Sequence, residues 1–144
     1  MQTSEMSYYQ ELADLMNSRP QDYEGLGEVN LTLGLVMHGG PSILRVKLQF
    51  EDLKCIQVSV LETGGETSCD CWLEGDIEAW AEMFEDIVTH GMATGRKTVN
   101  SLTLLGDRIN IHADDPLGKD LFFRFNQTVQ QFLDGAAQLQ HLTA

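Results

Sequence analysis

The glycines and cations between Gly91 and Thr98 are the first residues whose spacing suggests chemistry, because a glycine-rich loop ending in lysine can bind phosphate. Such a loop has four residues between its glycines and a lysine directly after the second one. Here three residues separate Gly91 from Gly95, and Arg96 precedes Lys97. The segment also follows a predicted helix, whereas a phosphate loop follows a strand. We therefore interpret it as a connector and expect no nucleotide site.

The cysteines Cys55, Cys69 and Cys71 are the residues that could bind a soft metal ion. A structural zinc site uses four ligands, usually from Cys-x-x-Cys pairs. A single residue separates Cys69 from Cys71, and no fourth ligand is evident. We expect these residues to be buried free thiols that pack as small apolar groups, without a metal or a disulfide.

A third polar group consists of His112, Asp114 and Asp115. An imidazole and carboxylates at this spacing could bind a metal or exchange a proton. In the alternative that we favour, Asp115 caps a helix that starts at Pro116, and His112 and Asp114 lie in a solvated turn. The chain has no Gly-x-Ser-x-Gly motif and no Cys–His pair in an activating context. We therefore expect that the protein is not an enzyme and binds no cofactor. Catalysis centred on His112 is the third of three hypotheses; the other two are given at the end of this subsection.

Composition narrows the classes of partner. A chain of 144 residues suits a single domain, 1–144, with one core. Nine Lys and Arg against 22 Asp and Glu leave a net charge of −13, which repels phosphate backbones and argues against nucleic-acid binding. No apolar run approaches the ~18 residues of a membrane span, so we expect no membrane insertion. The absence of a secretory signal pattern and the odd cysteine count favour a cytoplasmic location.

Strands are one of the two kinds of element that must position any site. Apolar and polar residues alternate over 29–37, 44–50, 56–60 and 69–73, with turns between them, a pattern typical of an antiparallel meander. Alternation at Leu102 and Leu104, and again at Ile109 and Ile111, predicts one bent strand or a turn followed by a strand. Helices must cover the apolar face of this sheet.

Three amphipathic helices are predicted. The first is capped by Thr3 or Ser4 and ends before Pro20. The second follows Asp76, whose carboxylate we expect to cap it. The third follows Asp115, and its end, Gln138–Ala144, is expected to fray. The apolar stripe of the second helix comprises Ile77, Trp80, Met83, Phe84, Ile87 and Val88. The stripe of the third comprises Leu121, Phe125, Val129, Phe132 and Ala136, widened by Phe122 and Leu133.

This order of elements resembles the sterol carrier protein type 2 domain. The likeness lies in Phe50-Glu51-Asp52, in 71–80 with Phe84, in 102–107 and in the Phe-rich helix 121–133. It implies an α+β fold: a five-stranded, mostly antiparallel sheet with helices packed on one face and a hydrophobic tunnel between the layers. Members of that family bind or transfer sterols, fatty acids or fatty acyl chains without catalysis. The chain departs from the family at Leu53, where a hairpin glycine is usual, and in a longer, polar segment 108–119.

The first hypothesis is therefore a non-catalytic protein that binds or carries a lipid-like ligand in such a tunnel. The second is a protein-interaction module with the same fold and a filled core, in which exposed residues such as Phe123 form an interface; a homodimer is left open. The expected ligand-binding residues are Ile77, Trp80, Phe84, Ile87, Leu102, Leu104, Phe122, Phe125, Val129 and Phe132.

Overall fold

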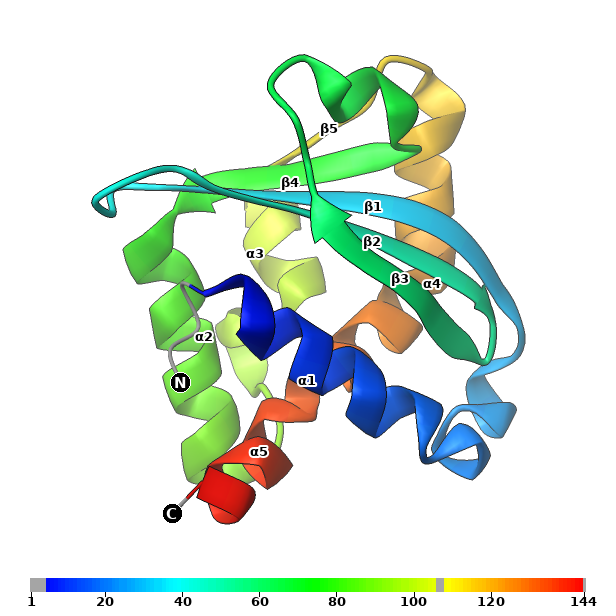
Figure 1. Ribbon diagram of the computed structural model, residues 1–144, viewed down its shortest axis with the longest axis vertical. Helices are drawn as coiled ribbons and strands as arrows, with labels where there is room; N and C mark the ends of the chain where they lie inside the picture. The colour runs from blue at the N-terminus through cyan, green and yellow to red at the C-terminus, as the bar shows by residue number, and fades with distance from the viewer. Residues whose placement is uncertain (1–4, 106–107, 144) are drawn as a thin grey trace.

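The chain folds into one sheet and a set of helices, which the computed structural model describes over residues 5–105 and 108–143 (Figure 1). The strands are β1 (Val29–His38), β2 (Leu44–Asp52), β3 (Lys54–Val60), β4 (Cys71–Asp76) and β5 (Ile109–His112). The α-helices are α1 (Met6–Asn17), α2 (Ile77–His90), α3 (Val99–Leu105), α4 (Pro116–Asp134) and α5 (Ala136–Thr143). Short 3-10 helices are η1 (Pro20–Asp22), η2 (Glu24–Leu26), η3 (Gly65–Ser68) and η4 (Gly95–Lys97).

The sheet has the strand order β3-β2-β1-β4-β5 and is mostly antiparallel. Strands β1, β2 and β3 form antiparallel hairpins, and β5 is antiparallel to β4. Strand β4 instead runs parallel to β1, with Leu35 opposite Leu73. The predicted four-strand meander is therefore wrong at its last step. Parallel strands need a crossover connection, and residues 61–70 supply it by passing from the β3 edge to the far side of β1.

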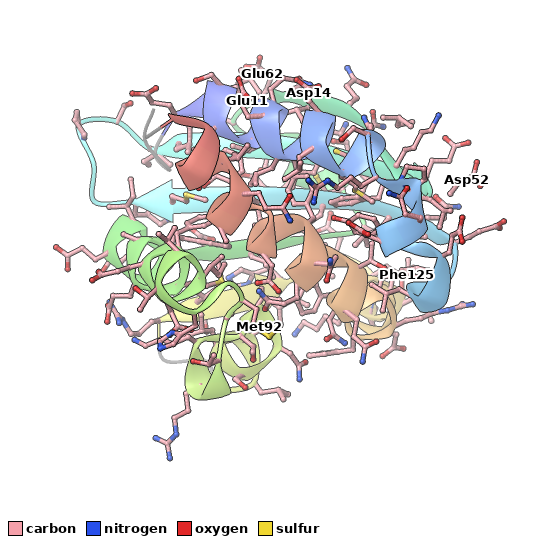
Figure 2. The ribbon with its side chains drawn as sticks, turned by 90° about the horizontal axis from the view of Figure 1, so that it is seen from below. Glu11, Asp14, Asp52, Glu62, Met92 and Phe125 are labelled. Carbon is pink, nitrogen blue, oxygen red and sulfur yellow. The ribbon has the colours of Figure 1, made fainter. Side chains whose placement is uncertain are left out.

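Helices α1, α2 and α4 cover one face of the sheet, as the resemblance implied, and α5 packs against α1 and α2 (Figures 1 and 2). Alternate residues of β1, such as Leu33 and Leu35, are fully buried under them. Aromatic rings fill much of the space between the layers: Phe50 of β2 meets Phe132 of α4 edge to face, with ring centroids 5.2 Å apart. This burial of apolar area is the main force that holds the layers together.

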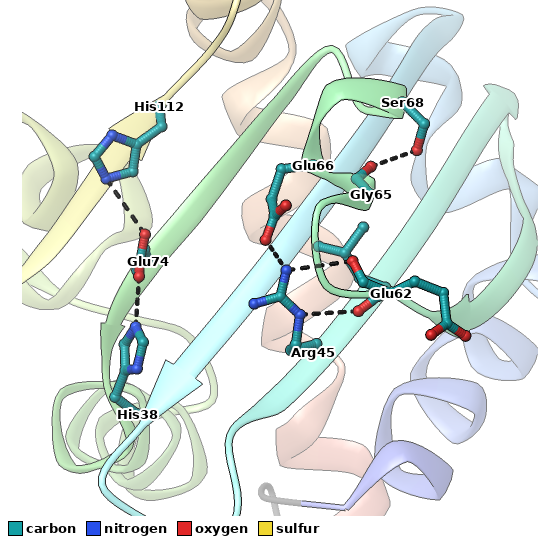
Figure 3. Close-up of polar contacts among 9 residues, drawn as sticks. His38, Arg45, Glu62, Gly65, Glu66, Ser68, Glu74 and His112 are labelled. Atoms are coloured by element: carbon teal, nitrogen blue, oxygen red, sulfur yellow. Dashed lines mark hydrogen bonds and ion pairs between the residues drawn. The ribbon is translucent and has the colours of Figure 1, made fainter.

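The opposite face of the sheet carries a second, small cluster beneath the crossover 61–70. Val36, Leu61 and Cys69 are buried there, with Trp72 packed against them. Gly34 makes the approach feasible, because a Cβ at this position would lie 2.9 Å from Trp72 Cβ. Arg45 fixes the crossover by donating from Nε to the Leu61 carbonyl over 2.9 Å and by pairing with Glu66 (Figure 3).

The first residues of the helices confirm one of the predicted N-caps and contradict another. Asp115 accepts a hydrogen bond from the Leu117 amide over 3.0 Å, which confirms it as the cap of α4. Asp76 occupies the cap position of α2, but its side chain makes no capping hydrogen bond, so that prediction is wrong. The residue before α1 is Glu5; Thr3 and Ser4 lie outside the described residues.

Two further segments differ from the predictions. Leu102 and Leu104 belong to helix α3 and not to a strand. The Thr98 hydroxyl accepts from the Ser101 amide at its start, and alternation over three residues is too short to separate strand from helix. The predicted Gly106-Asp107 turn lies outside the described residues, and Ile109 and Ile111 do form β5. The expected frayed end is helical in α5 as far as Thr143, with Ala144 outside the described range.

Across the described ranges 5–105 and 108–143, none of the helices combines the length and the apolar character needed to cross a bilayer.

Candidate ligand-binding site

The structure brings the predicted ligand-binding residues together with one exception. Six of them are buried members of the main core: Trp80, Phe84, Ile87, Phe122, Val129 and Phe132. Ile77, Leu102 and Phe125 are partly buried and pack against that core. Leu104 lies apart, because its position on α3 leaves the side chain 66% exposed. Phe123, expected to be exposed, is instead half-buried against the core and meets Phe122 edge to face at 5.4 Å.

Trp80 occupies a central position on α2 and is fully buried. Its indole Nε1 makes no hydrogen bond with any of the described residues, although the atom has no contact with solvent. Buried polar atoms in proteins are nearly always paired, and leaving one unpaired costs about 1–3 kcal/mol. The layer between sheet and helices therefore contains a donor that an oxygen atom could satisfy.

Phe125, an aromatic residue of α4, is partly buried and borders open space. It lines a groove of about 710 Å³ between α4 and the ends of β1 and β2, close to Asp52 at the same end of the molecule (Figure 2). The other lining residues are Glu28, Val29, Asn30, Glu51, Asp70, Leu121 and Arg124. Apolar and acidic side chains thus share one groove.

The walls of this groove are held by backbone contacts. The Asp70 carboxylate accepts from the Thr32 amide over 2.8 Å, and the Asp70 amide donates to the Thr32 carbonyl over 2.9 Å. Helix α4 approaches the Asp70 carbonyl so closely that a Cβ on Gly118 would collide with it. Asp52 turns β2 into β3 with φ of 58°, a left-handed conformation that Asp tolerates better than most residues. The carboxylates of Asp52 and Asp70 are therefore carried on fixed backbone.

A smaller cavity of about 100 Å³ lies where α1, α4 and the residues after α2 meet, and Asp134 and Met92 are among its lining residues. Asp134 accepts from the Ala93 amide over 3.1 Å and from Gln130 Nε2 over 2.8 Å. Burial raises the pKa of the Asp134 carboxyl above its usual value. Gln130 in turn accepts from the Val99 amide over 2.6 Å. These contacts attach the connector 91–98 and the first residue of α3 to α4.

The three cysteines lie in the interior, as the sequence indicated. Cys55, Cys69 and Cys71 are buried and free. Burial raises the pKa of both Cys55 and Cys71 to about 12, which leaves them unreactive near neutral pH. In the part of the chain that the structure describes, no group of three or more His, Cys, Asp or Glu residues is arranged to bind a metal ion.

The residues of the third hypothesis do not converge. The His112 ring stacks on Trp72 with centroids 5.7 Å apart, and its Nε2 lies 3.6 Å from Glu74 Oε1 (Figure 3). His38 pairs with the other oxygen of Glu74 at 2.5 Å, on the sheet face that the helices leave uncovered. Asp114 is exposed, and Asp115 caps α4. These three residues therefore form no common site.

The acidic groove was not predicted from the sequence. In the sequence, Glu51 and Asp52 indicate a turn and contribute to the family resemblance but do not indicate a site, and Glu28 and Asp70 carry no local signal. These residues come from three separate segments, so only the sheet topology brings them together. Phe125 was the one groove residue already expected to contact a ligand.

Comparison with known proteins supports the architecture. No family model matches the chain, and no curated protein matches it either. Among solved structures, one described as the crystal structure of sterol carrier protein 2 superposes with a TM-score of 0.70 at 17% sequence identity. The match covers 94% of this chain and 98% of that chain. The chain therefore has the sterol carrier protein 2-like fold, an α+β fold in which helices pack on one face of a five-stranded sheet.

Proposed function

We propose that this protein binds and carries a hydrophobic, lipid-like ligand between its sheet and helices, without catalysing a reaction on it. The unpaired Nε1 of Trp80 carries the proposal. A donor buried among apolar side chains costs free energy in the ligand-free protein, and a hydroxyl or carbonyl oxygen on an otherwise apolar molecule would recover it. The fold, which is that of a protein named as a sterol carrier, supports the same class of ligand.

The residues proposed to contact the ligand are nine of the ten predicted from the sequence, and Trp80 is proposed to meet the ligand oxygen. Leu104 is left out, because its side chain is 66% exposed on α3. In the structure most of them pack against one another, so the proposal requires these side chains to move apart when a ligand enters. Burying alkyl surface would provide the affinity, at about 0.8 kcal/mol per CH₂.

Two measurements test the proposal. Organic extraction of the purified protein followed by mass spectrometry should recover a lipid-like molecule. Calorimetric titration of extracted protein with 1-dodecanol, an uncharged chain with one oxygen, should show saturable binding. Absence of both a recovered molecule and dodecanol binding would refute the proposed function.

The role of Trp80 is tested by Trp80→Phe, which removes the N–H and keeps an aromatic ring. A neutral hydrogen bond contributes about 0.5–1.5 kcal/mol, so dodecanol affinity should fall roughly 2- to 10-fold. Trp72→Phe is the matched control, because Trp72 belongs to the cluster on the opposite face of the sheet. Equal dodecanol affinity in wild type and Trp80→Phe would show that Nε1 does not bind the ligand oxygen.

A further inference from the structure

We infer that the ligand is a cationic amphiphile: its ammonium head group lies in the groove at Phe125, and its long apolar chain, which carries the oxygen proposed to meet Trp80, extends into the core. The inference rests on the proposed function and specifies the class of molecule that the same site accepts. Three features of the groove carry it: its continuity with the core, its charge and its size.

Phe125 connects the groove with the core. It is half-buried, packs against the main core and also lines the groove. Phe122 and Val129, three residues before it and four after it, lie on the same face of α4 and are fully buried. A chain that enters from the groove along this face would pass Phe125 and reach the buried aromatic residues. Leu121 and Val29 add apolar surface to the groove itself.

The charge of the groove is negative. Four acidic residues, Glu28, Glu51, Asp52 and Asp70, line the groove together with one basic residue, Arg124. The Arg124 guanidinium lies over the Phe125 ring, 5.2 Å from its centroid, in a cation–π contact. An ammonium group would be attracted to this groove, whereas a fatty-acid carboxylate or a phosphate would be repelled by the excess of like charge. The net charge of −13 on the whole chain acts in the same direction at longer range.

The size of the groove suits a small molecule. Its volume of about 710 Å³ falls within the ~300–1,000 Å³ range of small-molecule sites. The apolar residues would contact the first carbons of the chain while the carboxylates surround the head group.

The experiment compares three chains of equal length, namely dodecylammonium, 1-dodecanol and dodecanoate, titrated below their aggregation concentrations at pH 7 and low salt. We expect dodecylammonium to bind at least tenfold more tightly than dodecanoate, with dodecanol between them. The difference in affinity between the three chains should shrink at 0.5 M salt, because the Debye length is only about 4 Å at that ionic strength. Glu51→Gln/Asp52→Asn should abolish most of the preference for ammonium.

A matched control removes the same charge elsewhere. Glu11 on α1 and Glu62 after β3 are exposed and distant from the groove (Figure 2). Glu11→Gln/Glu62→Gln should therefore leave the preference unchanged. Arg124→Gln should strengthen dodecylammonium binding, since it removes the cation of the groove.

The outcomes separate the two proposals. If dodecanol binds but dodecanoate binds as tightly as dodecylammonium, the charge selection is wrong and the proposed function stands. An equal loss of preference in both double variants would likewise overturn the groove as the head-group site. If none of the three chains binds, this inference fails, and the proposed function fails with it when extraction also recovers no lipid-like molecule.

Discussion

Replacing Gly118 with alanine should destabilise the protein, although alanine is the better helix former. Gly118 lies in the first turn of α4 and is buried against the backbone of Asp70. A Cβ there would collide with the Asp70 carbonyl oxygen and lie 2.9 Å from Ala113 Cβ. Because the nearest neighbour is backbone, no flexible side chain can move aside.

Helix propensity and the steric contact act in opposite directions, so the sign of the stability change in Gly118→Ala shows which of the two is larger. Helix propensity alone predicts that alanine stabilises a helix by about 0.5–1 kcal/mol relative to glycine. Overpacking a tight interior costs about 1–3 kcal/mol, and more where backbone must shift. The cost of the steric contact should exceed the gain in helix propensity, so the free energy of unfolding should fall by about 1–2 kcal/mol. A shift of α4 would also displace Asp70 in the acidic groove.

Urea unfolding followed by circular dichroism measures this change. Gly25→Ala is the matched control, because a Cβ on Gly25 would meet nothing within 4 Å and its φ is not in the left-handed region. At such a position alanine should be neutral or should stabilise by about 0.4–1 kcal/mol. If Gly118→Ala unfolds at the same or a higher urea concentration than wild type, the close approach of α4 to Asp70 is wrong.

Two further changes test contacts around the core. Asp134→Asn keeps an acceptor for the Ala93 amide and removes a partly buried charge. The raised pKa of Asp134 means that its protonated form is favoured in the folded state, so the stability linked to it is present at acidic pH and lost as the pH rises through the folded pKa. The variant should therefore gain stability over wild type between acidic pH and pH 7 in thermal unfolding; a pH-independent difference would count against this. Asn17→Ala removes a side chain that donates to the Cys55 carbonyl and accepts from the Cys55 amide, each over 2.9 Å. Leaving these groups unpaired should cost about 1–3 kcal/mol in urea unfolding, whereas the exposed Gln10→Ala on the same helix should change little; equal effects would show that the Asn17 contact contributes nothing.

Under the proposed function, ligand binding would change what Trp80 contacts. Without a ligand its ring is enclosed by core side chains and its Nε1 lacks an acceptor. An amphiphile whose head stays near Phe125 would bring a polar atom to Trp80 only if the chain itself carries an oxygen. Dodecylammonium and dodecanol thus report on different parts of the site, the groove and the indole respectively.

The sequence by itself determined the elements whose side chains repeat regularly. One-sided burial requires period-2 alternation in β1 and β2 and a 3.6-residue period in α2 and α4, so these elements could be read from apolar spacing. The same stripes identified the residues that meet between the layers, including Trp80 and Phe132. The cap at Asp115 was also readable, because it depends on neighbours within three residues.

Only the tertiary structure decided which strands are neighbours and what gathers at their ends. The parallel pairing of β4 with β1 depends on the crossover 61–70, whose path is set by packing over Gly34 and by Arg45. Helix α3 was misread because two alternating leucines carry too little periodicity. The acidic groove is lined by carboxylate residues from separate segments of the chain and by residues of α4. These α4 residues lie about 50 positions after Asp70 in the sequence. No local pattern encodes such a contact, because it arises from the order of strands in the sheet and not from the spacing of residues along it.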